Sequence, residues 1–72
     1  METVVKQKTL GRYYICMSSY IDHHGITMYQ VTCNEQRGAE YVQCGGLRTN
    51  DKKTANNKYY YFCRKAKIEQ CL

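Results

Sequence analysis

The chain has 72 residues, which is enough for one domain with a small core and excludes a second domain. Its hydrophobic share of 43% is typical of a folded chain and argues against a disordered one. No stretch approaches the roughly 18 apolar residues of a membrane span, so we expect no membrane partner.

The net charge of +5 is unevenly placed along the chain. Residues 1–47 carry equal numbers of cationic and acidic side chains and are neutral as a whole. Residues 48–67 carry seven cations against Asp51 alone, which gives this segment a charge of +6. A local excess of this size attracts an anionic partner.

Two strands and two turns are predicted in the first half. Alternating apolar and polar residues predict a strand over Gly11–Asp22 with its odd positions inward. Asp22–Gly25 has the residues of a type I turn that ends in a glycine bulge. Ile26–Asn34 is then the second strand, and Glu35–Gly38 repeats the turn chemistry. Residues 1–10 fit either a frayed end or a short edge strand.

The second half is predicted to hold two more strands. Glu40–Arg48 is the third, and its Gly45-Gly46 pair favours a bulge or bend over the approach of a ligand. Thr49–Asn57 is polar apart from one alanine, so we expect an exposed, mobile loop. Lys58–Ile68 contains four consecutive aromatic residues, which favour a fourth strand. Residues 65–72 fit either the end of that strand or a helical turn.

The expected fold is therefore a single domain over residues 1–72, mainly β. It is an antiparallel meander of about four strands that forms a bent sheet or open barrel, with room for a short C-terminal helical turn. A lone sheet leaves one face uncovered, so a partner or a second copy, as a homodimer, is a candidate cover. Besides cysteines, the expected inward side chains are Tyr13, Ile15, Met17, Ile21, Val31, Val42, Tyr60 and Phe62.

The five cysteines predict thiols rather than constitutive disulfides. Their number is odd and no apolar leader follows Met1, so we expect a reducing, cytoplasmic location. A Cys44–Cys63 bridge stays open as an alternative, because a loop between the third and fourth strands would place these residues opposite each other.

Metal binding, cofactor binding and catalysis are disfavoured. The cysteine spacings are too long for zinc knuckles, and the adjacent His23 and His24 fall in a turn. No nucleotide-binding, metalloprotease or nucleophile-elbow motif occurs, so we expect no enzyme and no cofactor.

Nucleic acid, either single-stranded DNA or RNA, is the favoured partner. Aromatic rings that stack on bases beside cations that contact phosphates form single-strand binding sites, and Lys58–Ile68 combines both. Tyr14 and Tyr20, on the outer face of the first strand, would extend the platform. The predicted binding residues are Arg48, Lys52, Lys53, Lys58, Tyr59, Tyr61, Arg64, Lys65 and Lys67.

Inhibition through protein contact is the alternative function. Interfaces are enriched in Tyr, Met and Arg, and this chain is rich in tyrosine. The same basic segment would then bind an acidic or nucleoprotein surface. A phage-type inhibitor that counters a defence nuclease or a CRISPR complex has these properties of size and charge.

Overall fold

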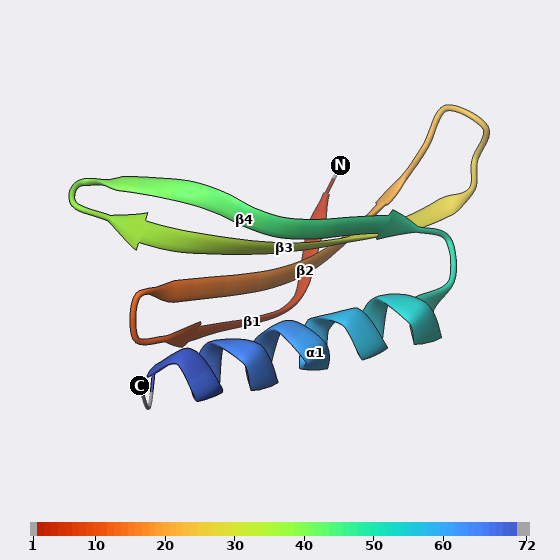
Figure 1. The fold of residues 1–72 in the computed structure, drawn as a ribbon. Helices are drawn as coiled ribbons and strands as arrows, with labels where there is room; N and C mark the ends of the chain where they lie inside the picture. Colours follow the sequence, from red (N-terminus) through yellow and green to blue (C-terminus); the bar gives the residue numbers. More distant parts are fainter. Residues whose placement is uncertain (1, 71–72) are drawn as a thin grey trace.

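The computed structural model describes residues 2–70, and in it one four-stranded sheet carries one helix (Figure 1). The elements are β1 (Thr3–Leu10), β2 (Tyr13–Ile21), β3 (Thr27–Arg37), β4 (Glu40–Thr49) and α1 (Lys52–Gln70). The strands are antiparallel neighbours in the order β1-β2-β3-β4, so β1 and β4 are the two edges of an open sheet. The expected bent antiparallel meander is confirmed, and α1 lies across one of its faces.

The strand predicted over Lys58–Ile68 is wrong, because these residues belong to α1. The buried side chains described in the helix recur at helical spacing and form one stripe against the sheet. These side chains are Ala55, Tyr59, Phe62 and Ala66. The free energy gained by burying this stripe against the sheet outweighs the β propensity of four consecutive aromatic residues, because tertiary packing overrides intrinsic preference. The fourth strand of the sheet is instead β1. Its residues lie in the segment 1–10, which the sequence allowed to be either a frayed end or a short edge strand.

The predicted loop Thr49–Asn57 is also wrong beyond Asp51, since α1 begins at Lys52. Asp51 caps the helix: its carboxylate accepts hydrogen bonds from the Lys53 backbone N–H at 3.2 Å and from the Thr54 hydroxyl at 2.6 Å. The Thr54 hydrogen bond is the main reason that the pKa of Asp51 lies below its ordinary value. Ala55, the one apolar residue of the predicted loop, is fully buried one turn further on.

The first predicted turn is confirmed and the second is displaced. The Gly25 N–H donates to the Asp22 carbonyl oxygen at 3.0 Å, and Gly25 has a φ of 79° that favours glycine. The second turn was predicted at Glu35–Gly38, which is too early by two to three residues. β3 continues through Arg37, and residues 38–39 form the turn. The longer β3–β4 hairpin extends beyond the C-terminal part of the helix (Figure 1).

The core lies between the sheet and α1. The predicted Tyr13, Ile15, Met17, Val31 and Phe62 are buried there, together with Cys33, Ala55, Tyr59 and Ala66. Three predicted core residues are exposed instead. Ile21 is at the end of β2 and Val42 is on the β3–β4 hairpin, where each is covered too little by α1. Tyr60 is 52% exposed because the helix turns about 100° per residue and Tyr59 takes the inward position.

A bulge interrupts β4, as the glycine pair predicts. Cys33 is opposite Gly45 and Asn34 is opposite Gln43, so Cys44 is an extra residue in the ladder. Gly45 also faces the helix, where a Cβ atom on this residue would lie 2.7 Å from Cε1 of Phe62. The absence of a side chain at Gly45 therefore lets the aromatic ring pack against the strand.

Candidate functional site

The predicted binding residues do not form one face. Arg48 is in register with Gln30 on the sheet face away from α1, where its guanidinium lies 5.9 Å from the Tyr20 ring. Lys52 and Lys53 are exposed in the first turn of the helix. The rest of the predicted set is divided between the two flanks of α1, except for Tyr59. Tyr14 and Tyr20 are on the far face of the sheet, so they cannot extend a platform on the helix.

Tyr59, predicted to point outward, is a core residue with 4% of its surface exposed. Burial is the main cause that raises its pKa from 10.0 to about 12, and the neighbouring Cys63 thiol contributes. The phenol is thus kept neutral inside the domain and is not available for stacking on a base.

The stability contributed by the neutral Tyr59 is present below pH 10 and is lost as the pH rises from 10.0 towards about 12. We therefore expect Tyr59→Phe to remove roughly 1.4 kcal/mol of the alkaline loss of unfolding free energy, measured by urea denaturation at about pH 8 and pH 11. Tyr61→Phe, at an exposed ring, is the control and should follow the unmodified chain. An equal alkaline loss in all three proteins would contradict this assignment.

A groove runs between β1 and α1, and both elements contribute cations to it. It has a volume of about 180 Å³ and is lined by Lys8, Leu10, Tyr60, Cys63, Arg64 and Lys67. Lys6, Lys8 and Leu10 alternate on the helix-facing side of β1, opposite Met17, Ile15 and Tyr13 of β2. Tyr60, Arg64 and Lys67 recur four and three residues apart, which places them on one stripe of the helix. We call Lys6, Lys8, Tyr60, Arg64 and Lys67 the cationic groove.

Lys6 on β1 forms hydrogen bonds to α1 across the cationic groove. Its ammonium donates to the Asn56 side-chain oxygen at 2.8 Å and to the Tyr60 hydroxyl at 3.3 Å. The same nitrogen lies 4.9 Å from the centre of the Tyr60 ring, within the range of a cation–π contact. Tyr60 is therefore oriented by Lys6 while half of its surface stays open to solvent.

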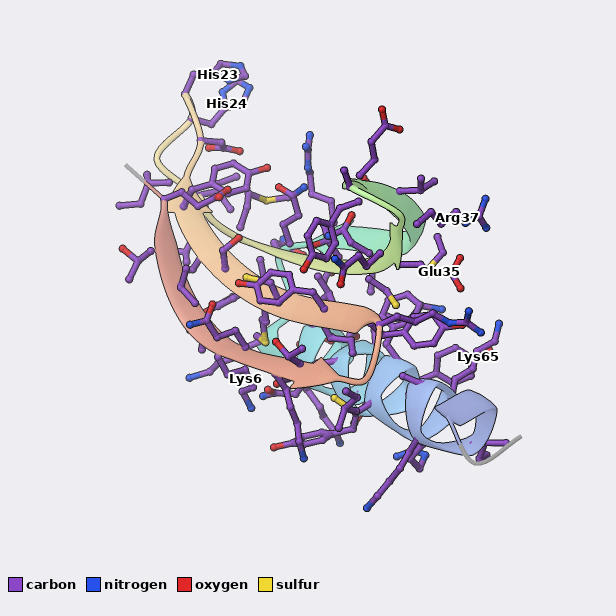
Figure 2. The ribbon with its side chains drawn as sticks, turned by 90° about the vertical axis from the view of Figure 1, so that its left-hand side faces the viewer. Lys6, His23, His24, Glu35, Arg37 and Lys65 are labelled. Atoms are coloured by element: carbon purple, nitrogen blue, oxygen red, sulfur yellow. The ribbon has the colours of Figure 1, made fainter. Side chains whose placement is uncertain are left out.

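Among the residues whose side chains the structure describes, no acidic side chain lines the cationic groove. The opposite flank of α1 differs: there Glu35 faces Lys65 across a cavity of about 220 Å³ and forms ion pairs with Arg37 at 2.6 Å and Arg12 at 3.4 Å. The hydrogen bond from Arg37 is the main cause that lowers the pKa of Glu35. Figure 2 shows Glu35, Arg37 and Lys65 at the same end of the molecule.

The remaining predicted residues belong to this second flank. The Lys58 ammonium lies 4.6 Å from the Tyr61 ring and 5.1 Å from the Phe62 ring. Tyr61 and Lys65 are exposed beside it. The prediction thus found Arg64 and Lys67 but missed Lys6, Lys8 and Tyr60 as their neighbours. The spacing of Ala55, Tyr59, Phe62 and Ala66 is the signal that would have revealed the helix and its outward stripe.

Other kinds of site are not evident in the described part of the chain. Among the side chains that the structure describes, no three from His, Cys, Asp or Glu form a group that could hold a metal ion. His23 and His24 have ring centres 4.0 Å apart at the tip of the β2–β3 loop, away from the other labelled residues (Figure 2). Within residues 2–70, no helix has the length and apolar character to cross a membrane.

Comparison with protein-family models, with curated proteins and with solved structures finds no match to this chain. The site is therefore interpreted from its own geometry.

Proposed function

We propose that this protein is a non-enzymatic module that binds single-stranded DNA or RNA in the cationic groove. The observation that carries the proposal is the meeting of four cations from β1 and α1 beside the exposed Tyr60 ring, with no acid among the lining residues described. Lys and Arg side chains contact phosphates, and an exposed ring stacks on an unpaired base. We expect it to act in the cytoplasm, because an odd number of cysteines suits a reducing compartment.

Single strands fit the groove better than duplexes for a physical reason. A base stacks on Tyr60 only where it is not already stacked within a duplex, so an unpaired strand gains both the ring contact and the phosphate contacts. A duplex gains only the phosphate contacts. The groove offers no set of paired donors and acceptors that would read a particular base, so we expect little sequence preference.

The salt dependence of binding tests this proposal. Fluorescence anisotropy with labelled single-stranded DNA and RNA of about 12 nucleotides should give micromolar Kd values at low salt. Because up to four cations replace counterions, log K should fall with log salt with a slope of roughly −2 to −3. A duplex of the same sequence should bind more weakly. Absence of binding at low salt, or affinity that does not change with salt, would contradict the proposal.

Inhibition by protein contact is a second candidate, and the sheet face away from α1 favours it. The register places Tyr14, Tyr20 and Tyr41 on this face among amide side chains, and Arg48 is its one charged residue among those described in the four strands. Tyr41 is 60% exposed. A nuclease or CRISPR complex held on this face by tyrosines would bind with little dependence on salt. Such binding would persist when the cationic groove is neutralised, which separates the two functions.

A further inference from the structure

Two thiols on neighbouring strands lie in contact. Sγ of Cys44 on β4 is 3.3 Å from Sγ of Cys33 on β3, and the Cys44 thiol also donates to the Cys33 carbonyl oxygen at 3.3 Å. The sequence led us to consider Cys63 as the partner of Cys44, but Cys63 is on α1 and lines the cationic groove. The neighbour of Cys44 is therefore the residue across the β3–β4 ladder.

The two thiols have different access to solvent. Cys33 is 5% exposed and packs in the core, whereas Cys44 is exposed. Cys44 is also the extra residue of the β4 bulge, and β4 is an edge strand with β3 as its one neighbour in the sheet. A solvent oxidant therefore reaches Cys44 first. Cys33 is in contact with Cys44 and is placed to react with the oxidised Cys44 sulfur.

Charged side chains of both signs line the cavity beside the exposed thiol. Cys44 shares the 220 Å³ cavity with Arg37, Lys65 and Glu35. The pKa of Arg37 is raised mainly by its hydrogen bond to Glu35, and the charge of a Cys44 thiolate contributes to the same shift. The exposed position of Cys44 in this cavity lets a peroxide reach its sulfur, and the thiolate is the form of cysteine that attacks peroxides.

We infer that Cys44 is a peroxide-reactive thiol and that Cys33 is its resolving partner. The Cys44 thiolate attacks one peroxide oxygen, the O–O bond breaks, and the hydroxide that leaves takes a proton to become water. The sulfur of Cys33 then attacks the Cys44 sulfenic acid, the S–O bond breaks, and the hydroxyl leaves as a second water with the Cys33 proton. Two thiols and one hydrogen peroxide thus give one disulfide and two waters, and the thiols supply both electrons.

The local structure allows this bond to form. The sulfur atoms must approach from 3.3 Å to about 2.05 Å. The unpaired residue of a bulge on an edge strand can move by this amount without breaking the ladder on both sides. The bond would join β4 to β3 and restrict the separation of the edge strand. It lies on the flank of α1 away from the cationic groove, so the inference does not depend on nucleic-acid binding.

Peptide mapping after oxidation tests the assignment. Trypsin leaves Cys16 and Cys33 on one peptide, residues 13–37, and Cys44 on another, residues 38–48. In the Cys16→Ser variant, one equivalent of hydrogen peroxide should link these two peptides. The melting temperature should rise by roughly 10 °C and return after dithiothreitol, because a short loop is closed. A link between Cys44 and Cys63, or no link while Cys44 stays reduced, would overturn the proposal.

Three further variants in the Cys16→Ser background separate the roles of the thiols. Cys44→Ser should abolish both the linked peptide and the rise in melting temperature. Cys33→Ala should leave a Cys44 sulfenic acid that dimedone traps, because no resolving thiol is adjacent. Cys63→Ser is the matched control and should react like its parent. Equal loss of the linked peptide in Cys63→Ser would also overturn the assignment. If Cys33→Ala fails to fold, the peptide maps of the parent and of Cys44→Ser still show whether Cys44 forms a disulfide with Cys33.

Discussion

Reversing both Arg64 and Lys67 to glutamate is expected to weaken the binding of single-stranded oligonucleotides by roughly 100-fold at low salt. The two side chains lie on the same stripe of α1 and line the cationic groove. The change removes two phosphate contacts and places two carboxylates where phosphates would approach. Anisotropy titration measures the affinity, and the salt slope should become shallower by about 1 to 2 because fewer counterions are released.

A matched variant separates the groove from net charge. Lys58→Glu with Lys65→Glu makes the same change in net charge on the same helix, but on the flank that carries Glu35. We expect a loss of no more than about 10-fold, which is a long-range effect of the reduced positive potential. Equal losses in the two variants would mean that overall charge governs binding. A larger loss for Lys58 and Lys65 would move the site to the other flank.

Stability must be checked in both variants before the affinities are compared. Arg64, Lys65 and Lys67 are exposed and form no ion pair among the described residues, so their reversal removes little packing. The melting temperature of the Arg64 and Lys67 variant should therefore stay within a few degrees of that of the unmodified protein. The Lys58 and Lys65 variant is expected to fall somewhat further, because it also loses the contacts of Lys58 with the Tyr61 and Phe62 rings. Alanine at Tyr60 completes the series: its loss of binding should exceed that of Tyr61→Ala, since Tyr60 is the ring that borders the groove.

Substituting Gly45 with alanine is expected to lower the free energy of unfolding by about 1 to 3 kcal/mol. The new Cβ would lie 2.7 Å from Cε1 and 2.8 Å from Cζ of Phe62, too close for either ring atom. The ring is 7% exposed and packed in the core, so it has little room to move. Urea denaturation measures the change.

The cause of this loss is tested by removing the ring. Phe62→Ala should cost about 3 to 5 kcal/mol because it leaves a cavity between α1 and the sheet. In that background Gly45→Ala should cost little, since its methyl group enters the cavity. The double variant should then be more stable than the sum of the single changes by about 1 kcal/mol or more.

Gly46→Ala is the control for that cycle. A Cβ at Gly46 would lie 2.7 Å from the amide nitrogen of Gln43 and 3.3 Å from the backbone oxygen of Val31, and none of its three nearest atoms belongs to Phe62. Phe62→Ala should therefore not change the cost of Gly46→Ala. Strictly additive costs for Gly45 and Phe62 would contradict the proposed contact.

The meander was predictable because its signals are local. The alternation in Gly11–Asp22 and the turn residues Asp22–Gly25 specify a hairpin without reference to the rest of the chain. β1 has no such signal, since its polar residues suit a strand only at the edge of a sheet. There Lys6 and Lys8 lie on the helix-facing side of the strand, and the Lys6 ammonium donates hydrogen bonds to Asn56 and Tyr60 of α1.

The helix was missed because two local signals disagree. Tyr59–Phe62 has high β propensity, and the segment before it is polar, so the pair of segments is typical of a loop followed by a strand. The helical spacing of Ala55, Tyr59, Phe62 and Ala66 is a weaker pattern, because two of its four members are small. Ala55 and Ala66 stabilise the helix position only in the folded domain, where their small side chains let α1 approach the sheet closely.

By itself, the amino-acid sequence determined that this protein is a small β meander with its positive charge concentrated after residue 47. Only the tertiary structure decided which cations share a surface. Side chains alternate by about 180° along a strand and turn by about 100° along a helix, so a change of element redistributes every side chain after Asp51. Lys6 and Lys8 meet Arg64 and Lys67 only because α1 packs across the sheet beside β1, a contact between segments more than fifty residues apart.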